Sequence, residues 1–208
     1  ELRKNKGSVS ESLMRKLGAE VFALTSCYDA MINKYLSVHF GAALAKEKFP
    51  QALNLGFTKV QELRYGENPH QKAAFYKEKN AQNGIINAKQ LQGKELSYNN
   101  ILDLNAAVEL AKEFSSPAAV IVKHNNPCGV AENASLEKAY IEAWKCDQLS
   151  AFGGIVALNR KLDLKTAKAV AKSGFLECVI APEIPEECRR IFKDKKNLRL
   201  LELKAMEP

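Results

Sequence analysis

Two helices are predicted within residues 8–48 from the spacing of apolar positions. The first has a stripe at intervals of three and four residues, formed by Leu13, Leu17, Val21 and Leu24. The second has a similar stripe of Tyr28, Ile32, Tyr35 and Leu36. Ser8 and Glu11 have the spacing of a capping box at the start of the first helix. Pro50 cannot continue a helix, so residues 45–58 are a candidate domain boundary.

Beyond this boundary, strand-like and helix-like patterns alternate along the chain. Short apolar runs predict strands at 73–76, 118–123, 154–158, 177–181 and 198–203. Helical patterns occupy 100–114, 135–146, 163–173 and a short stretch after Pro185. Strands separated by helical stretches of about ten residues favour an α/β fold with a mostly parallel sheet. The run at 118–123 has the composition of a parallel strand that is buried on both faces.

Composition narrows the class of protein. The 208 residues are enough for one sizeable core with an attached segment, and 46% hydrophobic and 26% charged residues are ordinary for a soluble protein. No apolar run approaches the roughly 18–20 residues that a membrane-spanning helix needs. The chain starts without an initiator Met or the apolar core of a signal peptide, so we expect an excised piece of a longer chain. Five cysteines without a CxxC spacing predict a reduced, cytoplasmic protein without a structural zinc site.

The positive net charge indicates possible partners. An excess of 31 Lys and Arg over 24 Asp and Glu gives +7, which suits nucleic acid, a membrane surface or small phosphorylated substrates. The aromatic residues do not alternate with basic ones as in a single-strand binding groove. The densest basic stretch, residues 189–196, is therefore interpreted as a solvated face rather than a nucleic-acid site.

A His–Lys pair follows the strand predicted at 118–123. Lys123 and His124 are placed at its carboxyl end, where open α/β sheets bind ligands, and a turn at Asn126-Pro127 follows. A neighbouring ammonium disfavours protonated imidazole, so Lys123 should help keep His124 neutral and able to accept a proton. Lys123 can also donate hydrogen bonds to developing negative charge. This pair is the best candidate for a catalytic site.

Two further segments carry binding chemistry. Arg64-Tyr65-Gly66 offers a guanidinium that can bind an anion or amide through two hydrogen bonds, a phenol and a flexible backbone position. An exposed Arg beside a packed Tyr explains the same residues equally well. Gly153-Gly154 precedes a predicted strand and allows the backbone to approach a ligand closely.

Several reaction classes lose support from the sequence. Pro127-Cys128 is similar to the start of the PCxxC zinc motif of nucleotide deaminases. Position 131 is Ala rather than Cys, however, and Asn126 stands where the preceding HxE motif needs its acid, so zinc hydrolysis is excluded. The chain also contains neither a P-loop nor a GxSxG elbow, which argues against NTP hydrolysis and serine hydrolase chemistry.

Four motifs together resemble one known family. They are RYGENPHQ at 64–71, ELSYNNILDLNAA at 95–107, VKHNNPCGVA at 122–131 and SAFGGIVALNR at 150–160. In this order they resemble the bifunctional purine-biosynthesis family, which combines AICAR transformylase with IMP cyclohydrolase. Residues 8–38, with ALTSCYD at 23–29, resemble the closing helices of the cyclohydrolase domain.

The resemblance implies a fold and a domain organisation. Residues 61–208 would be the first transformylase subdomain, a three-layer α/β/α unit of cytidine-deaminase-like fold. Residues 1–48 would be C-terminal helices of the cyclohydrolase domain, with a linker at 49–60. The chain would then be less than half of such a protein, with further folate-site and nucleotide-site residues outside it.

The resemblance also implies an activity. Family members transfer a formyl group from 10-formyltetrahydrofolate, a co-substrate, to the 5-amino group of AICAR, and cyclise the product to IMP. His124 matches the general base and Lys123 the transition-state-stabilising lysine. Matches to nucleotide-contacting residues are Arg64, Tyr65, Asn100, Gly153 and Glu177. Homodimers with shared active sites are implied, without a metal, nucleic acid or membrane partner. Two alternatives stay open: an isolated chain that is an inactive nucleotide-binding or dimerisation module, or nucleic-acid binding, which predicts steeply salt-dependent affinity.

Overall fold

The computed structural model describes residues 1–40, 49, 53–78, 81, 83–204 and 206. The chain divides into two compact units, Glu1–Thr58 and Lys59–Pro208. The end of the predicted segment 1–48 and part of the predicted linker 49–60 lie outside the described residues. The strand β1 (Phe57–Leu63) begins within the segment predicted as a linker.

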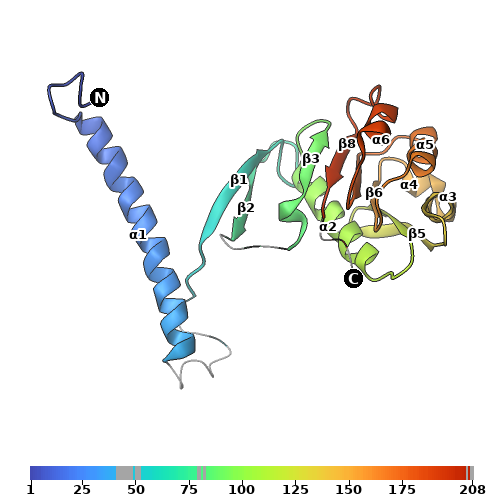
Figure 1. Cartoon of the computed structure of the whole chain (residues 1–208), viewed down its shortest axis with the longest axis horizontal. Coiled ribbons are helices and arrows are strands. Elements are labelled where there is room, and N and C mark those ends of the chain that lie inside the picture. Colours follow the sequence, from blue (N-terminus) through green and yellow to red (C-terminus); the bar gives the residue numbers. More distant parts are fainter. Residues whose placement is uncertain (41–48, 50–52, 79–80, 82, 205, 207–208) are drawn as a thin grey trace. The chain divides into compact units, whose positions relative to one another are not determined.

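The first unit contains one long helix, α1 (Glu11–His39), shown in blue in Figure 1. The prediction of two separate helices was wrong, because no proline interrupts these 29 residues. The predicted cap was also wrong by two residues: Ser10, not Ser8, accepts a hydrogen bond at 3.3 Å from the backbone N–H of Leu13.

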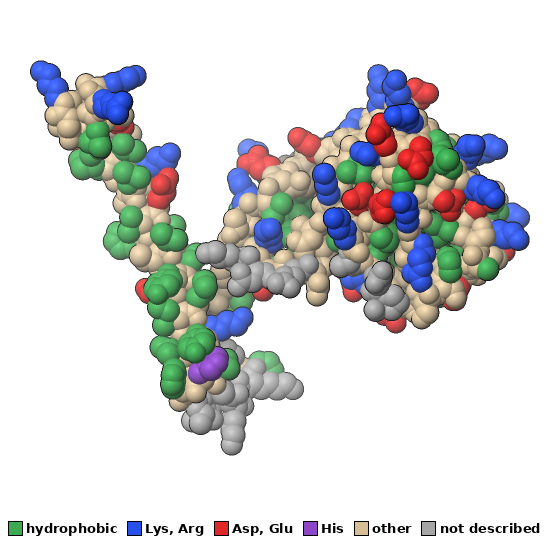
Figure 2. All heavy atoms as spheres, in the orientation of Figure 1, with side chains coloured by type: hydrophobic (Ala, Val, Ile, Leu, Met, Phe, Trp, Pro, Cys, Tyr) green, Lys and Arg blue, Asp and Glu red, His purple; other side chains and the backbone are tan. Residues whose placement is uncertain are grey.

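The apolar side chains of α1 are exposed. None of the helix's described residues is buried, and Figure 2 shows hydrophobic groups along its length. An alternating spacing of three and four residues relates eight exposed apolar residues: Met14, Leu17, Val21, Leu24, Tyr28, Met31, Tyr35 and Val38. This is the heptad spacing of helices that pack against a partner helix.

Within the described part of the second unit, a six-stranded sheet has the order β3-β8-β7-β6-β4-β5, and β1 pairs separately with β2 (Ala73–Glu78). The six strands are β3 (Lys89–Gln92), β4 (Ala118–Lys123), β5 (Asn126–Glu132), β6 (Ile155–Leu158), β7 (Cys178–Ala181) and β8 (Arg199–Glu202). Of the strand pairs in this sheet, β6–β7 and β7–β8 are parallel, whereas β3–β8, β4–β6 and β4–β5 are antiparallel. The predicted mostly parallel sheet was therefore wrong. Two residues join β4 to β5, which is too short for a parallel crossover.

Helices cover both faces of this sheet, which confirms the α/β class and the α/β/α layers (Figure 1). One face packs against α2 (Tyr98–Lys112), preceded in sequence by the short η2 (Ile85–Asn87). The other face packs against α3 (Leu136–Cys146), α5 (Leu164–Lys172) and α6 (Glu186–Ile191), with the one-turn α4 (Gln148–Ala151) ahead of β6.

Residues of β4 alternate between the two cores. Val120 and Val122 pack with α2, whereas Ala119 and Ile121 pack with the α3 and α5 side. Burial of every residue from Ala118 to Val122 explains the continuous apolar run in the sequence. A continuous apolar run shows that both faces of a strand are covered, but it does not show the direction of the strand. The assignment of a parallel strand was wrong for this reason.

The strand register decides which residues share one end of the sheet. Val122 pairs with Ile155, Ile155 with Cys178, and Cys178 with Arg199. The carboxyl end of β4 therefore lies beside the amino ends of β6, β7 and β8. This end of the sheet collects most of the polar residues that the sequence singled out.

Candidate active site

His124 occupies a strained two-residue turn between β4 and β5. Lys123 pairs with Asn126 across the hairpin, and the turn residues His124 and Asn125 have φ angles of 52° and 62°. Two-residue hairpins favour positive φ at both positions, which Asn adopts more readily than most side chains. Conformations of this kind cost on the order of 1–3 kcal/mol each and persist only where their surroundings hold them.

The carboxylate of Asp103, on α2, holds this turn. Its Oδ2 accepts a hydrogen bond from the backbone N–H of His124 at 3.1 Å, and its Oδ1 accepts from that of Asn125 at 2.7 Å. On the other side, Asn126 Nδ2 donates to the carbonyl oxygen of His124 at 2.9 Å. Both peptide groups that flank the His124 side chain are thus fixed, while His124 itself is exposed.

Lys123 contacts the glycine loop that the sequence also indicated. Its Nζ donates to the carbonyl oxygen of Phe152 at 2.8 Å. The next residue, Gly153, has a φ of 77° and donates its N–H to the carbonyl of Phe175 at 2.7 Å. Lys123 and Gly153 therefore lie at the same end of the sheet, with the ammonium at the loop that precedes β6.

A hollow of about 460 Å³ opens beside the His–Lys pair. It is bordered by Lys123, His124, Asn126, Pro127, Cys128, Asp147 and Ser150. Its volume lies within the range of small-molecule sites, and its lining combines polar and apolar groups. Both predicted catalytic side chains border this one hollow.

The charges around the hollow have opposite signs. Hydrogen bonds from the Ser150 side chain and backbone N–H lower the pKa of Asp147, so this carboxylate is ionised at neutral pH. Burial raises the pKa of the Cys128 thiol, the negative charge of Asp147 adds to that shift, and Lys123 opposes it. The hollow thus presents an ammonium, a carboxylate and a neutral thiol.

Arg64, Tyr65 and Asn100 meet at the amino end of α2. The N–H of Arg64 donates to the carbonyl of Leu96 at 3.0 Å, and the carbonyl of Tyr65 accepts from Tyr98 at 3.2 Å. The guanidinium carbon of Arg64 lies 5.3 Å from the centre of the Tyr65 ring, within cation–π range.

Asn100 has a capping role that the sequence analysis missed. Its Oδ1 accepts from the backbone N–H of Ser97 at 3.1 Å, while Ser97 Oγ accepts from the N–H of Asn100 at 3.2 Å. This reciprocal box fixes the start of α2 and leaves the Asn100 amide nitrogen as a donor.

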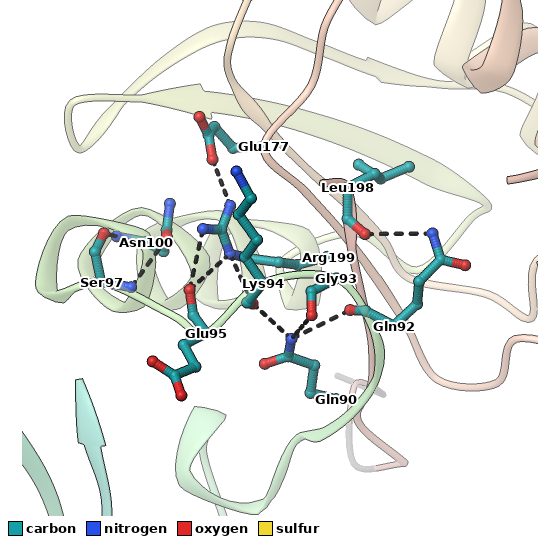
Figure 3. A network of polar contacts seen from close by, with 10 residues as sticks. All are labelled: Gln90, Gln92, Gly93, Lys94, Glu95, Ser97, Asn100, Glu177, Leu198 and Arg199. Carbon is teal, nitrogen blue, oxygen red and sulfur yellow. Dashed lines mark hydrogen bonds and ion pairs between the residues drawn. The ribbon is translucent and has the colours of Figure 1, made fainter. Parts of the chain in front are cut away.

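Glu177 is paired within the chain. Its carboxylate accepts from the guanidinium of Arg199, whose side chain is only 3% exposed (Figure 3). The same guanidinium donates to the carbonyl oxygens of Lys94 and Glu95 at 3.0 to 3.1 Å. Arg199 thus links the amino ends of β7 and β8 to the loop that leads into α2.

The predicted residues form two groups that α2 connects. Lys123, His124 and Gly153 lie around the hollow or its adjoining loop, whereas Arg64, Tyr65 and Asn100 lie at the start of α2. Asp103 is three residues after Asn100, so both side chains project from the same face of the helix. The sequence analysis missed Asp103, although this spacing was a usable signal.

Within the described ranges, His, Cys, Asp and Glu do not form any group of three or more that is placed to hold a metal ion. Among the helices in the described part of the chain, none is long and apolar enough to cross a membrane.

The fold and the site define an α/β protein in which a His–Lys pair borders a hollow at one end of a mixed sheet. The sequence profile of the family described as the AICARFT/IMPCHase bienzyme matches residues 1–208, and the chain belongs to this family. This confirms the resemblance that the four motifs indicated.

Full-length relatives give the same result. The bifunctional purine biosynthesis protein PurH of Acetivibrio thermocellus is 53% identical over 204 residues, which are 98% of this chain and 38% of the relative. That of Myxococcus xanthus is 55% identical over 205 residues, or 97% of this chain and 38% of the relative. The chain therefore spans about 38% of the length of these curated relatives.

Among solved structures, RibD of Acinetobacter baumannii has a TM-score of 0.37 at 19% identity, over 50% of this chain and 35% of that one. This likeness is too low to support a conclusion about fold or activity.

Proposed function

We propose that this chain carries the catalytic pair for formyl transfer from 10-formyltetrahydrofolate to the 5-amino group of AICAR, within a longer enzyme that also forms IMP. Membership of the bienzyme family supports the reaction class. The observation that carries the proposal is that His124 is exposed and borders the same hollow as Lys123, on a turn that is held by hydrogen bonds to Asp103.

Each member of the pair has a distinct role in this reaction. The amine of AICAR is a weak nucleophile because its lone pair is delocalised into the ring. His124 accepts the amine proton as the new C–N bond forms, a contribution of about 10²–10⁴-fold in rate. Lys123 donates to the formyl oxygen as negative charge develops there. An ammonium has three donors, so Lys123 retains its bond to Phe152 while doing so. The bond between the formyl carbon and the folate nitrogen then breaks. That nitrogen takes the proton that His124 had accepted, and tetrahydrofolate leaves.

The proposed nucleotide contacts are Arg64, Tyr65, Asn100, Gly153 and Glu177. Three of them cluster at the amino end of α2, where the helix dipole favours an anionic ligand. The net charge of +7 suits a nucleotide and a polyanionic folate. Because Glu177 is already paired with Arg199, its part in binding is the least direct of the five.

The proposed assembly is a cytoplasmic homodimer that acts on small molecules, without a nucleic-acid or membrane partner. The exposed heptad face of α1 supports association with further protein surface. The five cysteines are free, as a reducing compartment requires.

The test is formyl transfer by a full-length bienzyme that carries this sequence, monitored by tetrahydrofolate release. We expect His124→Ala and Lys123→Ala to lower kcat at least 100-fold, with a much smaller change in KM for AICAR. The matched controls are His39→Ala and Lys168→Ala, which remove an exposed His and Lys outside the hollow and should change kcat by less than about twofold. Unchanged turnover in both site variants would contradict the proposal.

The isolated 208-residue chain provides a second test, because it spans only part of its relatives. We expect it to lack turnover on its own. Detectable formyl transfer by this chain would rule out the alternative that it is only a nucleotide-binding or dimerisation module.

A further inference from the structure

The turn that presents His124 depends on a residue from another element. In a two-residue hairpin, the residues that flank the turn pair with each other, and the N–H groups of the turn residues have no partner in the ladder. Here both of these N–H groups, from His124 and Asn125, donate to the two oxygens of Asp103. Asp103 lies about twenty residues earlier in the sequence, on α2.

This contact fixes the direction of the imidazole. The peptide before His124 is held by Asp103 at its N–H, and the peptide after it is held by Asn126 at its carbonyl and by Asp103 at its N–H. With both peptides fixed, the Cα–Cβ bond of His124 has one direction, and only the side-chain torsions remain free. The exposed turn has a positive φ at both residues, a conformation that needs external support.

Asp103 is suited to this role by its own position. It lies within α2, whose residues Leu104, Ala107 and Val108 are fully buried against the sheet. The carboxylate is therefore attached to one of the most firmly packed elements of the unit, whereas His124 and Asn125 are exposed. A rigid support for an exposed catalytic group is what general-base geometry requires.

We infer that Asp103 is a positioning residue for His124: it acts on formyl transfer by holding the turn, not by contact with the substrate. This inference rests on the proposed function of His124. It predicts that the catalytic effect of Asp103 disappears when the His124 imidazole is absent.

The test is a double-mutant cycle in the full-length bienzyme. We expect Asp103→Ala to lower kcat about 10–100-fold, with less than a threefold change in KM for AICAR. Asp103→Asn keeps one acceptor oxygen and should lose less. In the His124→Ala background, Asp103→Ala should cause no further loss, because its effect passes through the missing imidazole. The matched control is Glu113→Gln, which removes an exposed carboxylate from the end of the same helix and should leave kcat unchanged.

A second readout does not depend on activity. Amide hydrogen exchange in the 208-residue chain should speed up at least tenfold at His124 and Asn125 in Asp103→Ala, but not in Glu113→Gln. Unchanged exchange at these two amides in Asp103→Ala would overturn the inference. Faster exchange with a normal kcat in Asp103→Ala would also overturn it. So would losses in kcat that add up in the Asp103→Ala and His124→Ala double variant. Loss of folding in both Asp103 variants would make Asp103 a structural residue and would also overturn it.

Failure of the proposed function gives a different pattern. In that case His124→Ala has normal turnover whatever the exchange at the turn, and both conclusions fall together. If kcat still depends on His124 but not on Asp103, only the inference about Asp103 is overturned, and the proposed function stands.

Discussion

The carboxylate of Glu177 is paired with the guanidinium of Arg199, a side chain that is 3% exposed at the amino end of β8. Arg199 also donates to the carbonyls of Lys94 and Glu95, and Gln90 Nε2 donates to the Lys94 carbonyl at 2.7 Å (Figure 3). The loop between β3 and α2 is therefore held from two strands. Since this loop leads directly to the capping box of α2, the pair stabilises the segment on which Arg64, Tyr65 and Asn100 converge.

Removing Arg199 should destabilise the second unit more than removing the charge of Glu177. Arg199→Ala leaves a carboxylate and two carbonyls without their donor, so we expect the free energy of unfolding to fall by about 3 kcal/mol. This value is at the lower end for buried ion pairs because Glu177 is 35% exposed. Glu177→Gln keeps an acceptor and should cost about 1 kcal/mol. Urea unfolding followed by circular dichroism measures both.

The exposed pair of Lys161 and Glu183 provides the control, since Lys161→Ala should change the free energy of unfolding far less than Arg199→Ala does. The same variants separate the two roles of Glu177. A Glu177→Gln enzyme with normal stability and a several-fold higher KM for AICAR would favour the nucleotide contact over the ion pair.

Local patterns predicted the elements that have a strong apolar period. The strands at 118–123 and 154–158 and the helices at 135–146 and 163–173 agree with β4, β6, α3 and α5 to within one or two residues at each end. In these segments both burial and propensity favour the same structure, so the pattern is sufficient.

Local patterns failed where partners are distant. The turn was predicted at Asn126-Pro127, yet it lies at His124 and Asn125, and Asn126 begins the edge strand β5, where the missing N–H of Pro127 is tolerated. The parts played by Asp103 and Arg199 depend on contacts with residues about twenty or more positions away. Helical spacing could place Asp103 on the face of Asn100, but it carries no information about such distant contacts. The motifs had selected Lys123 and His124, and these two residues border one hollow.

Gly129 should not accept any side chain. A Cβ at this position would lie 1.9 Å from the carbonyl oxygen of Ala143 and 3.2 Å from the Cβ of Cys146, so β5 would have to move away from α3. We expect Gly129→Ala to destabilise the second unit by about 3 kcal/mol or more in urea unfolding. Gly56→Ala, where a Cβ meets open space, should change stability by less than about 0.5 kcal/mol. Equal stability of the two variants would contradict the close approach of β5 and α3.

The stability of the second unit should depend on Tyr140 at high pH. Burial raises the pKa of the Tyr140 hydroxyl from 10.0 to about 12, against the opposing effect of its hydrogen bond with Ser173. Because the folded pKa lies above the unfolded value, the contribution to stability is complete below pH 10 and is lost as the pH rises towards 12. The slope is at most about 1.4 kcal/mol per pH unit.

Tyr140→Phe isolates this effect, because it removes the ionisable group and one hydrogen bond. At pH 8 the variant should be about 1 kcal/mol less stable than the wild type, since Ser173 retains its bond to Val170. Between pH 10 and 11 the difference should shrink. A difference that stays constant with pH would show that Tyr140 titrates normally.

Cys128 should react slowly with alkylating agents although it borders the hollow. The thiolate is the reactive form, and burial together with Asp147 raises the pKa of this thiol, so less thiolate is present at a given pH. We expect iodoacetamide to modify Cys128 at least about fivefold more slowly than glutathione at pH 7.5, as measured by peptide mass spectrometry. Asp147→Asn removes the nearby negative charge and should speed this reaction.

Asp163→Asn is a closely matched control for that variant. Asp163 caps α5 as Asp147 caps α4, each accepting from the backbone N–H and the hydroxyl three residues later. Asp163→Asn should leave the rate at Cys128 unchanged, because its charge does not contribute to the shift in the pKa of Cys128. Equal rates in both variants would mean that Asp147 does not face the thiol. A faster rate in Asp147→Asn alone would show that the Asp147 carboxylate faces the Cys128 thiol across the hollow.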